Sequence, residues 1–174
     1  NMHFRVLALN ARGYPPSEVP ETPDAYGWQE NRDDVIALLD HLQIEKAHMV
    51  GLSMGGYIAL MLGIISPERC LSIVCASGGS GAHPPTRDAF IQDSVISAEQ
   101  ILKDKQIPAE GMASAPNRIQ LRHKDEAAWQ QFRRQLADRP YLGAAYTLTE
   151  VQAKRPGLHD FADQLTHLML PVLL

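Results

Sequence analysis

Cysteines, basic clusters and long apolar runs are all scarce in this sequence, and each absence excludes a class of protein. Cys70 and Cys75 are the only cysteines among 174 residues; they flank an apolar run and are interpreted as reduced, buried thiols, not as a disulfide framework. The 16 Lys and Arg residues are outnumbered by 20 Asp and Glu residues and form no basic block, so nucleic acid is not an expected partner. The longest apolar run, residues 57–65, is far shorter than the roughly 20 residues that cross a bilayer, so no membrane partner is expected either.

Sequence signs of a cofactor or a metal are also missing. No group of histidines and carboxylates has the spacing of metal ligands. The glycine-rich stretch 77–81 lacks the lysine and the following apolar helix of a phosphate-binding loop, and it is interpreted as a hinge. No targeting peptide is visible, and a cytoplasmic location is expected.

The first half of the chain alternates strand and helix patterns. With 45% hydrophobic and 21% charged residues, the composition suits one globular domain with a buried core. Short β-rich or apolar runs alternate with segments of helical periodicity, which favours an α/β fold with a parallel sheet. In chain order we expect a strand at 3–10, a proline-rich loop, a helix at 26–42, a strand at 47–50, a helix ending at 65 and a strand at 71–76.

The pattern changes after residue 76. Residues 86 to about 164 are mostly helical or irregular, with candidate helices at 87–103, 126–137 and 143–154, and they read as an insertion laid over the sheet. A final apolar run, residues 168–174, has the composition of another strand.

The stretch GLSMGGY, residues 51–57, joins an apolar strand to a long apolar helix. A Gly-x-Ser-x-Gly turn between a strand and a helix forces Ser53 into a strained conformation, and Gly51 and Gly55 are expected to relieve the crowding around it. Gly56 would let the helix pass close to the strands, and the N–H of Met54 would point toward the serine oxygen at the positive end of the helix dipole. The alternative is that Ser53 is an ordinary helix N-cap.

With these segments in view, the chain resembles the α/β-hydrolase superfamily over almost its whole length. The resemblance lies in residues 4–17, 47–78 and 163–174, in the family's order. The first of these matches the pattern Asp-x-Arg-Gly-x-Gly-x-Ser, except that Asn10 replaces the acid and Pro15 replaces a glycine. The resemblance implies a partial, doubly wound parallel sheet with a mainly helical cap.

The resemblance also implies roles for residues and a division of the chain. Ser53 would be the nucleophile, and the N–H of Met54 would be one donor of the oxyanion hole. Residues 1–82 would form the partial core with the nucleophile elbow, residues 83–164 the cap or lid, and residues 165–174 the start of the next core strand.

The remaining catalytic groups of the family would fall outside this sequence. The second oxyanion donor precedes the first segment, and the triad acid and histidine follow the last strand. We therefore expect the chain to be a fragment that carries the nucleophile without its partners and that has little or no activity alone.

Local residues are weaker candidates for these roles. His83, in the loop after the third strand, is the best local candidate for a base, although the family's order of serine, acid and histidine argues against it. His48 is interpreted as a packed ring in the strand, and Asp160 and Asp163 as capping or solvated residues. The remaining histidines are interpreted as surface or hydrogen-bonded core residues: His41, His123, His159 and His167. Four aromatic residues are interpreted as the core of the cap, with the lining of a pocket as the alternative: Trp129, Phe132, Tyr141 and Tyr146.

The function predicted is a serine hydrolase that acts on a small carboxylic ester through an acyl-enzyme intermediate. Thioesters, lactones and the ketones cleaved by C–C bond hydrolases stay open, because the same triad serves them all. Another alternative is a non-catalytic, receptor-like member that binds a ligand. The expected partner is a small ester-like molecule, and the sequence does not indicate an oligomeric state.

Overall fold

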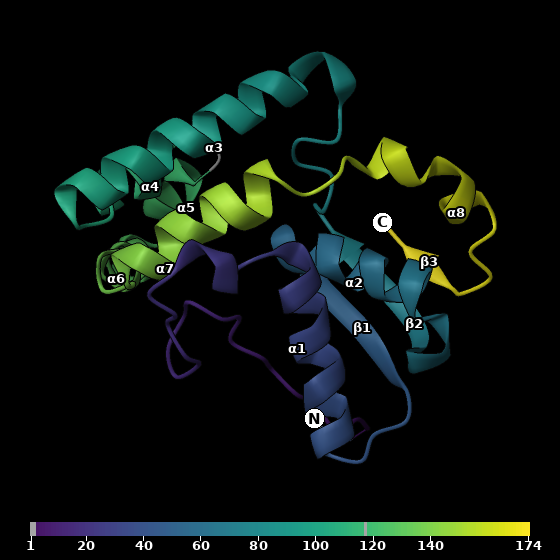
Figure 1. Cartoon of the computed structure of the whole chain (residues 1–174). Coiled ribbons are helices and arrows are strands. Elements are labelled where there is room, and N and C mark those ends of the chain that lie inside the picture. The colour runs from purple at the N-terminus through teal and green to yellow at the C-terminus, as the bar shows by residue number, and fades with distance from the viewer. Residues whose placement is uncertain (1–2, 117) are drawn as a thin grey trace.

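A small parallel sheet organises the structure, a computed structural model that describes residues 3–116 and 118–174 (Figure 1). Within those residues the sheet has three strands in the order β1-β2-β3, and both pairings are parallel, as predicted. Their bounds are β1 (Ala47–Leu52), β2 (Cys70–Ala76) and β3 (Val172–Leu173).

Two helices lie over one face of this sheet, α1 (Trp28–His41) and α2 (Met54–Ile65) (Figure 1). Helix α2 carries apolar residues on every face, and every face is packed against other parts of the chain. These are the sheet, α1 and the chain near Phe161 and Leu165. Tyr57 and Met61 of α2 are consequently 1% and 0% exposed. No helix in the described ranges is both long enough and apolar enough to span a membrane.

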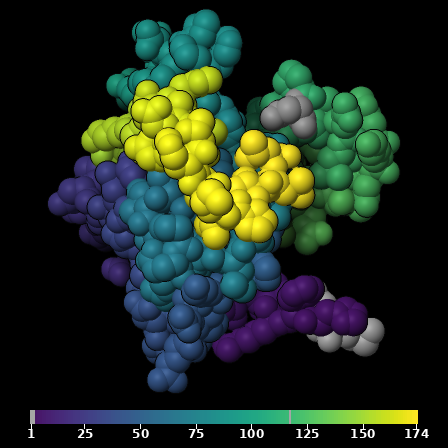
Figure 2. Space-filling view, turned by 90° about the vertical axis from the view of Figure 1, so that its right-hand side faces the viewer, coloured from purple at the N-terminus to yellow at the C-terminus, as the bar shows by residue number. Residues whose placement is uncertain are grey.

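The expected strand at residues 3–10 is absent, and this prediction was wrong. The segment is extended but lies outside the sheet, and it projects from the body of the molecule (Figure 2). Phe4 and Val6 are 63% and 68% exposed, and the ring of Phe4 only meets His48 of β1 edge-on. High β-propensity describes a fit to a pleated, half-buried surface, and this segment has no such surface to pair with.

The chain between β2 and β3 is mainly helical, and we call residues 84–154 the helical segment. The three helices predicted there are present, but the third is divided into an α-helical and a π-helical part. The elements are α3 (Pro84–Asp104), α4 (Ala109–Ala113), α5 (Ile119–Lys124), α6 (Glu126–Ala137), α7 (Tyr141–Tyr146) and the π-helix η3 (Thr147–Ala153). Shorter elements complete the fold: η1 (Pro23–Ala25), η2 (Pro67–Arg69), η4 (Leu158–Phe161) and α8 (Ala162–Thr166).

Helix α7 docks on the proline-rich loop through two glycines. A Cβ on Gly143 would lie 2.0 Å from the carbonyl oxygen of Gly13, so the two backbones touch with no room for a side chain. Next to this contact, the rings of Tyr26 and Tyr146 lie 5.4 Å apart. The helical segment is therefore fixed by backbone contact to the proline-rich loop that precedes α1.

Replacing Gly143 with alanine should destabilise the protein, because the added carbon would collide with backbone atoms of Gly13 that cannot rotate away. Overpacking of this kind costs about 2 kcal/mol, which corresponds to a fall of about 5 °C in Tm for a domain of this size. Gly111→Ala is the matched control, because a Cβ there would meet nothing within 4 Å. If calorimetry gave the same Tm for Gly143→Ala and Gly111→Ala, the close contact would be contradicted.

Candidate active site

Ser53 lies at a sharp turn between the end of β1 and the start of α2. Its φ of 54° and ψ of −114° belong to a region that residues other than glycine rarely occupy. Two backbone hydrogen bonds hold it there, from its N–H to the carbonyl of Ala76 (2.8 Å) and from the N–H of Tyr57 to its own carbonyl (3.0 Å). The residue is exposed, and although it occupies the N-cap position, its side chain makes no capping bond.

Glycines make this turn possible, but only Gly51, and not Gly55, relieves crowding as the sequence suggested. A Cβ on Gly51 would lie 2.0 Å from the carbonyl oxygen of Gly55, so position 51 has no space for a side chain. A Cβ on Gly55 would meet nothing within 4 Å, so the crowding is relieved at position 51 and not by the missing side chain at 55. At Gly56 a Cβ would lie 3.1 Å from the carbonyl of Ala76, which reflects the close approach of α2 to the strands.

Met54 is the first residue of α2. The N–H groups of a helix's first turn have no partner within the helix, and the helix dipole places partial positive charge there. The exposed Ser53 thus directly precedes the backbone N–H groups of this first turn.

The structure does not pair this serine with a base among residues 4–116 and 118–174. Among residues 4–116 and 118–174, no hydrogen bond joins the Ser53 hydroxyl to a histidine or a carboxylate. His83 is the exposed N-cap residue of α3. His48 is not a packed ring as expected; it is exposed on β1, with Nδ1 2.7 Å from the hydroxyl of Ser72 on β2.

The other residues considered from the sequence cap a turn or pack in a core. Asp160 accepts a hydrogen bond from the N–H of Gly157 (2.7 Å), which is the capping role expected for it. Trp129 is buried in a small core with Phe132 and Leu136, so the interpretation as core is confirmed for both aromatic rings. Both cysteines are free and buried, and burial raises the pKa of each thiol.

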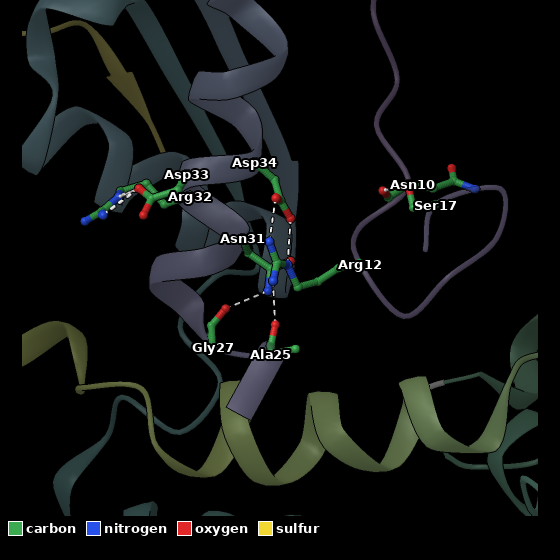
Figure 3. Close-up of polar contacts among 9 residues, drawn as sticks. All are labelled: Asn10, Arg12, Ser17, Ala25, Gly27, Asn31, Arg32, Asp33 and Asp34. Carbon is green, nitrogen blue, oxygen red and sulfur yellow. Dashed lines mark hydrogen bonds and ion pairs between the residues drawn. The ribbon is translucent and has the colours of Figure 1, made fainter. Parts of the chain in front are cut away.

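The loop after residue 10 is tied to α1 by an ion pair (Figure 3). Arg12 donates from Nε and Nη2 to the two carboxylate oxygens of Asp34, at 2.8 and 2.6 Å, and from Nη1 to the carbonyl of Ala25. The bond with Asp34 raises the pKa of Arg12 above its usual value. Asn10, which replaces the family's acid, donates to the carbonyl of Pro15, so the two departures from the family pattern meet inside this loop.

A buried aromatic ring follows the serine by one helical turn. Burial raises the pKa of Tyr57 to about 12, although Arg155 and Arg87 act in the opposite direction. Its hydroxyl is buried without a hydrogen-bond partner in the described chain. Arg155 is only 2% exposed, and its burial could not be predicted from the sequence, because an arginine just after a helix is ordinarily solvated and no local pattern marks this one as buried.

This raised pKa predicts a pH dependence of stability. The folded protein holds the phenol proton more tightly than the unfolded chain, so the stability from this group is fully present below pH 10 and is lost as the pH rises to about 12. Tyr57→Phe removes the group and should make the fall in the free energy of unfolding between those pH values shallower. Urea titrations at several alkaline pH values measure this slope, and equal slopes for the two proteins would contradict the assignment.

Comparison with known proteins identifies the family. A model of the alpha/beta hydrolase fold matches residues 1–101, which is more than half of the chain. The chain belongs to the alpha/beta hydrolase fold family. This confirms the predicted fold class.

Individual relatives of this alpha/beta hydrolase chain match parts of it. It is 42% identical over 77 residues to 3-oxoadipate enol-lactonase 1 of Acinetobacter baylyi, a match covering 44% of this chain and 28% of the relative. It is 35% identical over 78 residues to the 2-hydroxy-6-oxononadienedioate/2-hydroxy-6-oxononatrienedioate hydrolase of Paraburkholderia xenovorans, with 45% and 27% covered. Among solved structures, a hydrolase from Pseudomonas aeruginosa PA01 superposes with a TM-score of 0.80 at 28% identity, covering 98% of this chain and 60% of that one. The matches thus span little more than a quarter of each of these curated relatives.

Proposed function

We propose that the protein is a serine hydrolase that cleaves a small carboxylic ester or related acyl substrate, with Ser53 as the nucleophile. The observation that carries the proposal is the strained, exposed Ser53 at the start of α2, outside the carboxyl end of β1. The similarity to an enol-lactonase supports it, because a lactone is a cyclic ester.

The chemistry has two stages, formation of the acyl-enzyme and its hydrolysis. The Ser53 oxygen bonds to the substrate carbonyl carbon as a base takes its proton, and the negative oxygen that forms accepts a hydrogen bond from the N–H of Met54. The bond to the leaving alcohol then breaks, and the alcohol takes the proton. Water next attacks the acyl-enzyme, which releases the carboxylic acid and restores the serine hydroxyl.

The division of the chain follows from the same proposal. Residues 1–82 form the core that carries the nucleophile, residues 83–164 form a cap that shapes the substrate pocket, and residues 165–174 return to the sheet. The docking of α7 on the loop at Gly13 supports a cap that is packed on the core.

A fluorophosphonate probe tests the nucleophile directly. The protein expressed from its full open reading frame should react with the probe at Ser53, located by peptide mass spectrometry, and should hydrolyse p-nitrophenyl esters. Active protein that carries the label at another serine would refute the assignment. Turnover of a C–C bond substrate in preference to esters would replace the substrate class while keeping the nucleophile.

A further inference from the structure

Arg155 lies buried where three parts of the chain meet. Its guanidinium carbon, Cζ, lies over the ring of Tyr57 in α2, 4.5 Å from the ring centroid, and 5.8 Å from the ring centroid of Phe90 in α3. Its Nη2 donates to the carbonyl of Ser80, in the loop after β2 (2.7 Å). Arg87, in the first turn of α3, donates in turn to the carbonyl of Arg155. The beginning of the helical segment is therefore joined here to the residue that directly follows its end.

This cation is unusual because it is buried without an opposite charge. Within the described ranges no carboxylate forms an ion pair with Arg155, and its Nη1 has no hydrogen-bond partner. Burial lowers its pKa. Apolar residues of similar size often stabilise a protein at least as well as buried charges do, so stability alone does not account for a guanidinium at this place.

The position of the guanidinium relates it to the nucleophile. Tyr57 donates its N–H to the carbonyl of Ser53, so the ring under Arg155 belongs to the helical turn that holds the serine. A guanidinium that lies over this ring and donates to the Ser80 carbonyl fixes both the separation and the relative orientation of these two segments, which an apolar side chain would not.

We propose that Arg155 is a positioning residue that holds both ends of the helical segment at a fixed distance from the first turn of α2. In the proposed cap, this distance sets how closely the helical segment approaches Ser53 and so determines which acyl groups are accepted. The proposal rests on the proposed function, since it takes Ser53 as the point of attack.

The test separates pocket shape from chemistry in the full-length protein. Arg155→Lys keeps the charge but not the planar fork, and it should raise KM about tenfold for a long-chain ester such as p-nitrophenyl hexanoate. Its kcat for p-nitrophenyl acetate and its rate of labelling by a small fluorophosphonate should stay within about twofold of the wild type. Arg122→Met is the matched control, because Arg122 also lies over a ring, that of Trp129, but is exposed on α5.

Chemical rescue adds a readout that loss of packing alone would not produce. In Arg155→Ala, millimolar guanidinium should lower the raised KM toward the wild-type value, whereas sodium at equal ionic strength should not. A wild-type KM in Arg155→Lys, or no effect of guanidinium on Arg155→Ala, would overturn the proposal. A wild-type protein that neither labels at Ser53 nor hydrolyses esters would instead overturn the proposed function.

Discussion

Replacement of Ser53 by alanine is expected to lower kcat for ester hydrolysis by at least about a thousandfold, because the proposed acyl-enzyme forms on the Ser53 oxygen. Folding should be unaffected or slightly altered, since the side chain is exposed and makes no capping bond. Steady-state hydrolysis of p-nitrophenyl acetate by the protein from the full open reading frame measures the loss, and circular dichroism checks the fold.

The structure supplies a matched control in Ser77. It is also exposed, has a similar positive φ of 52°, and follows β2 as Ser53 follows β1. Ser77→Ala should keep kcat within about twofold of the wild type. If Ser53→Ala retains wild-type turnover, or if Ser77→Ala loses it, the nucleophile is not Ser53.

Replacement of Gly51 by alanine should be the most destabilising change in the turn. The new Cβ would lie 2.0 Å from the carbonyl oxygen of Gly55 and 2.5 Å from the nitrogen of Gly56, so either the strand or the helix must shift. We expect a loss of about 3 kcal/mol in the free energy of unfolding, at the upper end of overpacking effects. Equilibrium urea unfolding followed by fluorescence would measure it.

Gly55→Ala provides the opposite case four residues away. Its Cβ would enter open space, and alanine is favoured over glycine inside a helix by about 0.5–1 kcal/mol. This variant should therefore be as stable as the wild type or more so. Similar urea midpoints for both variants would show that the turn relaxes easily and that the backbone at Ser53 is not held by its neighbours.

The sequence predicted the elements whose pattern is local. The helix at 126–137 matches α6 in both bounds, because an aspartate cap precedes a strongly periodic segment. The turn at Ser53 was likewise predictable, since a glycine-serine motif between a strand and a helix leaves few backbone solutions. The division of the last helix into α7 and a π-helix has no signal of this kind.

Features that depend on distant contacts were not predictable. The segment at 3–10 has the composition of a strand but lacks a partner, and pairing cannot be deduced from composition. His48 is exposed because its face of the sheet is open, with Val50 beside it 75% exposed. The burial of Arg155 arises from segments up to 98 positions away in sequence, as its contact with Tyr57 illustrates.

Residues 77–81 were expected to act as a hinge, yet the backbone contact between Gly13 and Gly143 lies far along the chain from them. A body attached at two separate places cannot swing about one of them without breaking the other. We therefore expect α3 and α7 to stay in place and any movement to be confined to α4, α5 and α6, since α4 and α6 pack in a small cluster of their own at Trp129. Slow exchange of amide hydrogens in α7 alongside fast exchange in α4 would be the signature of such a divided motion.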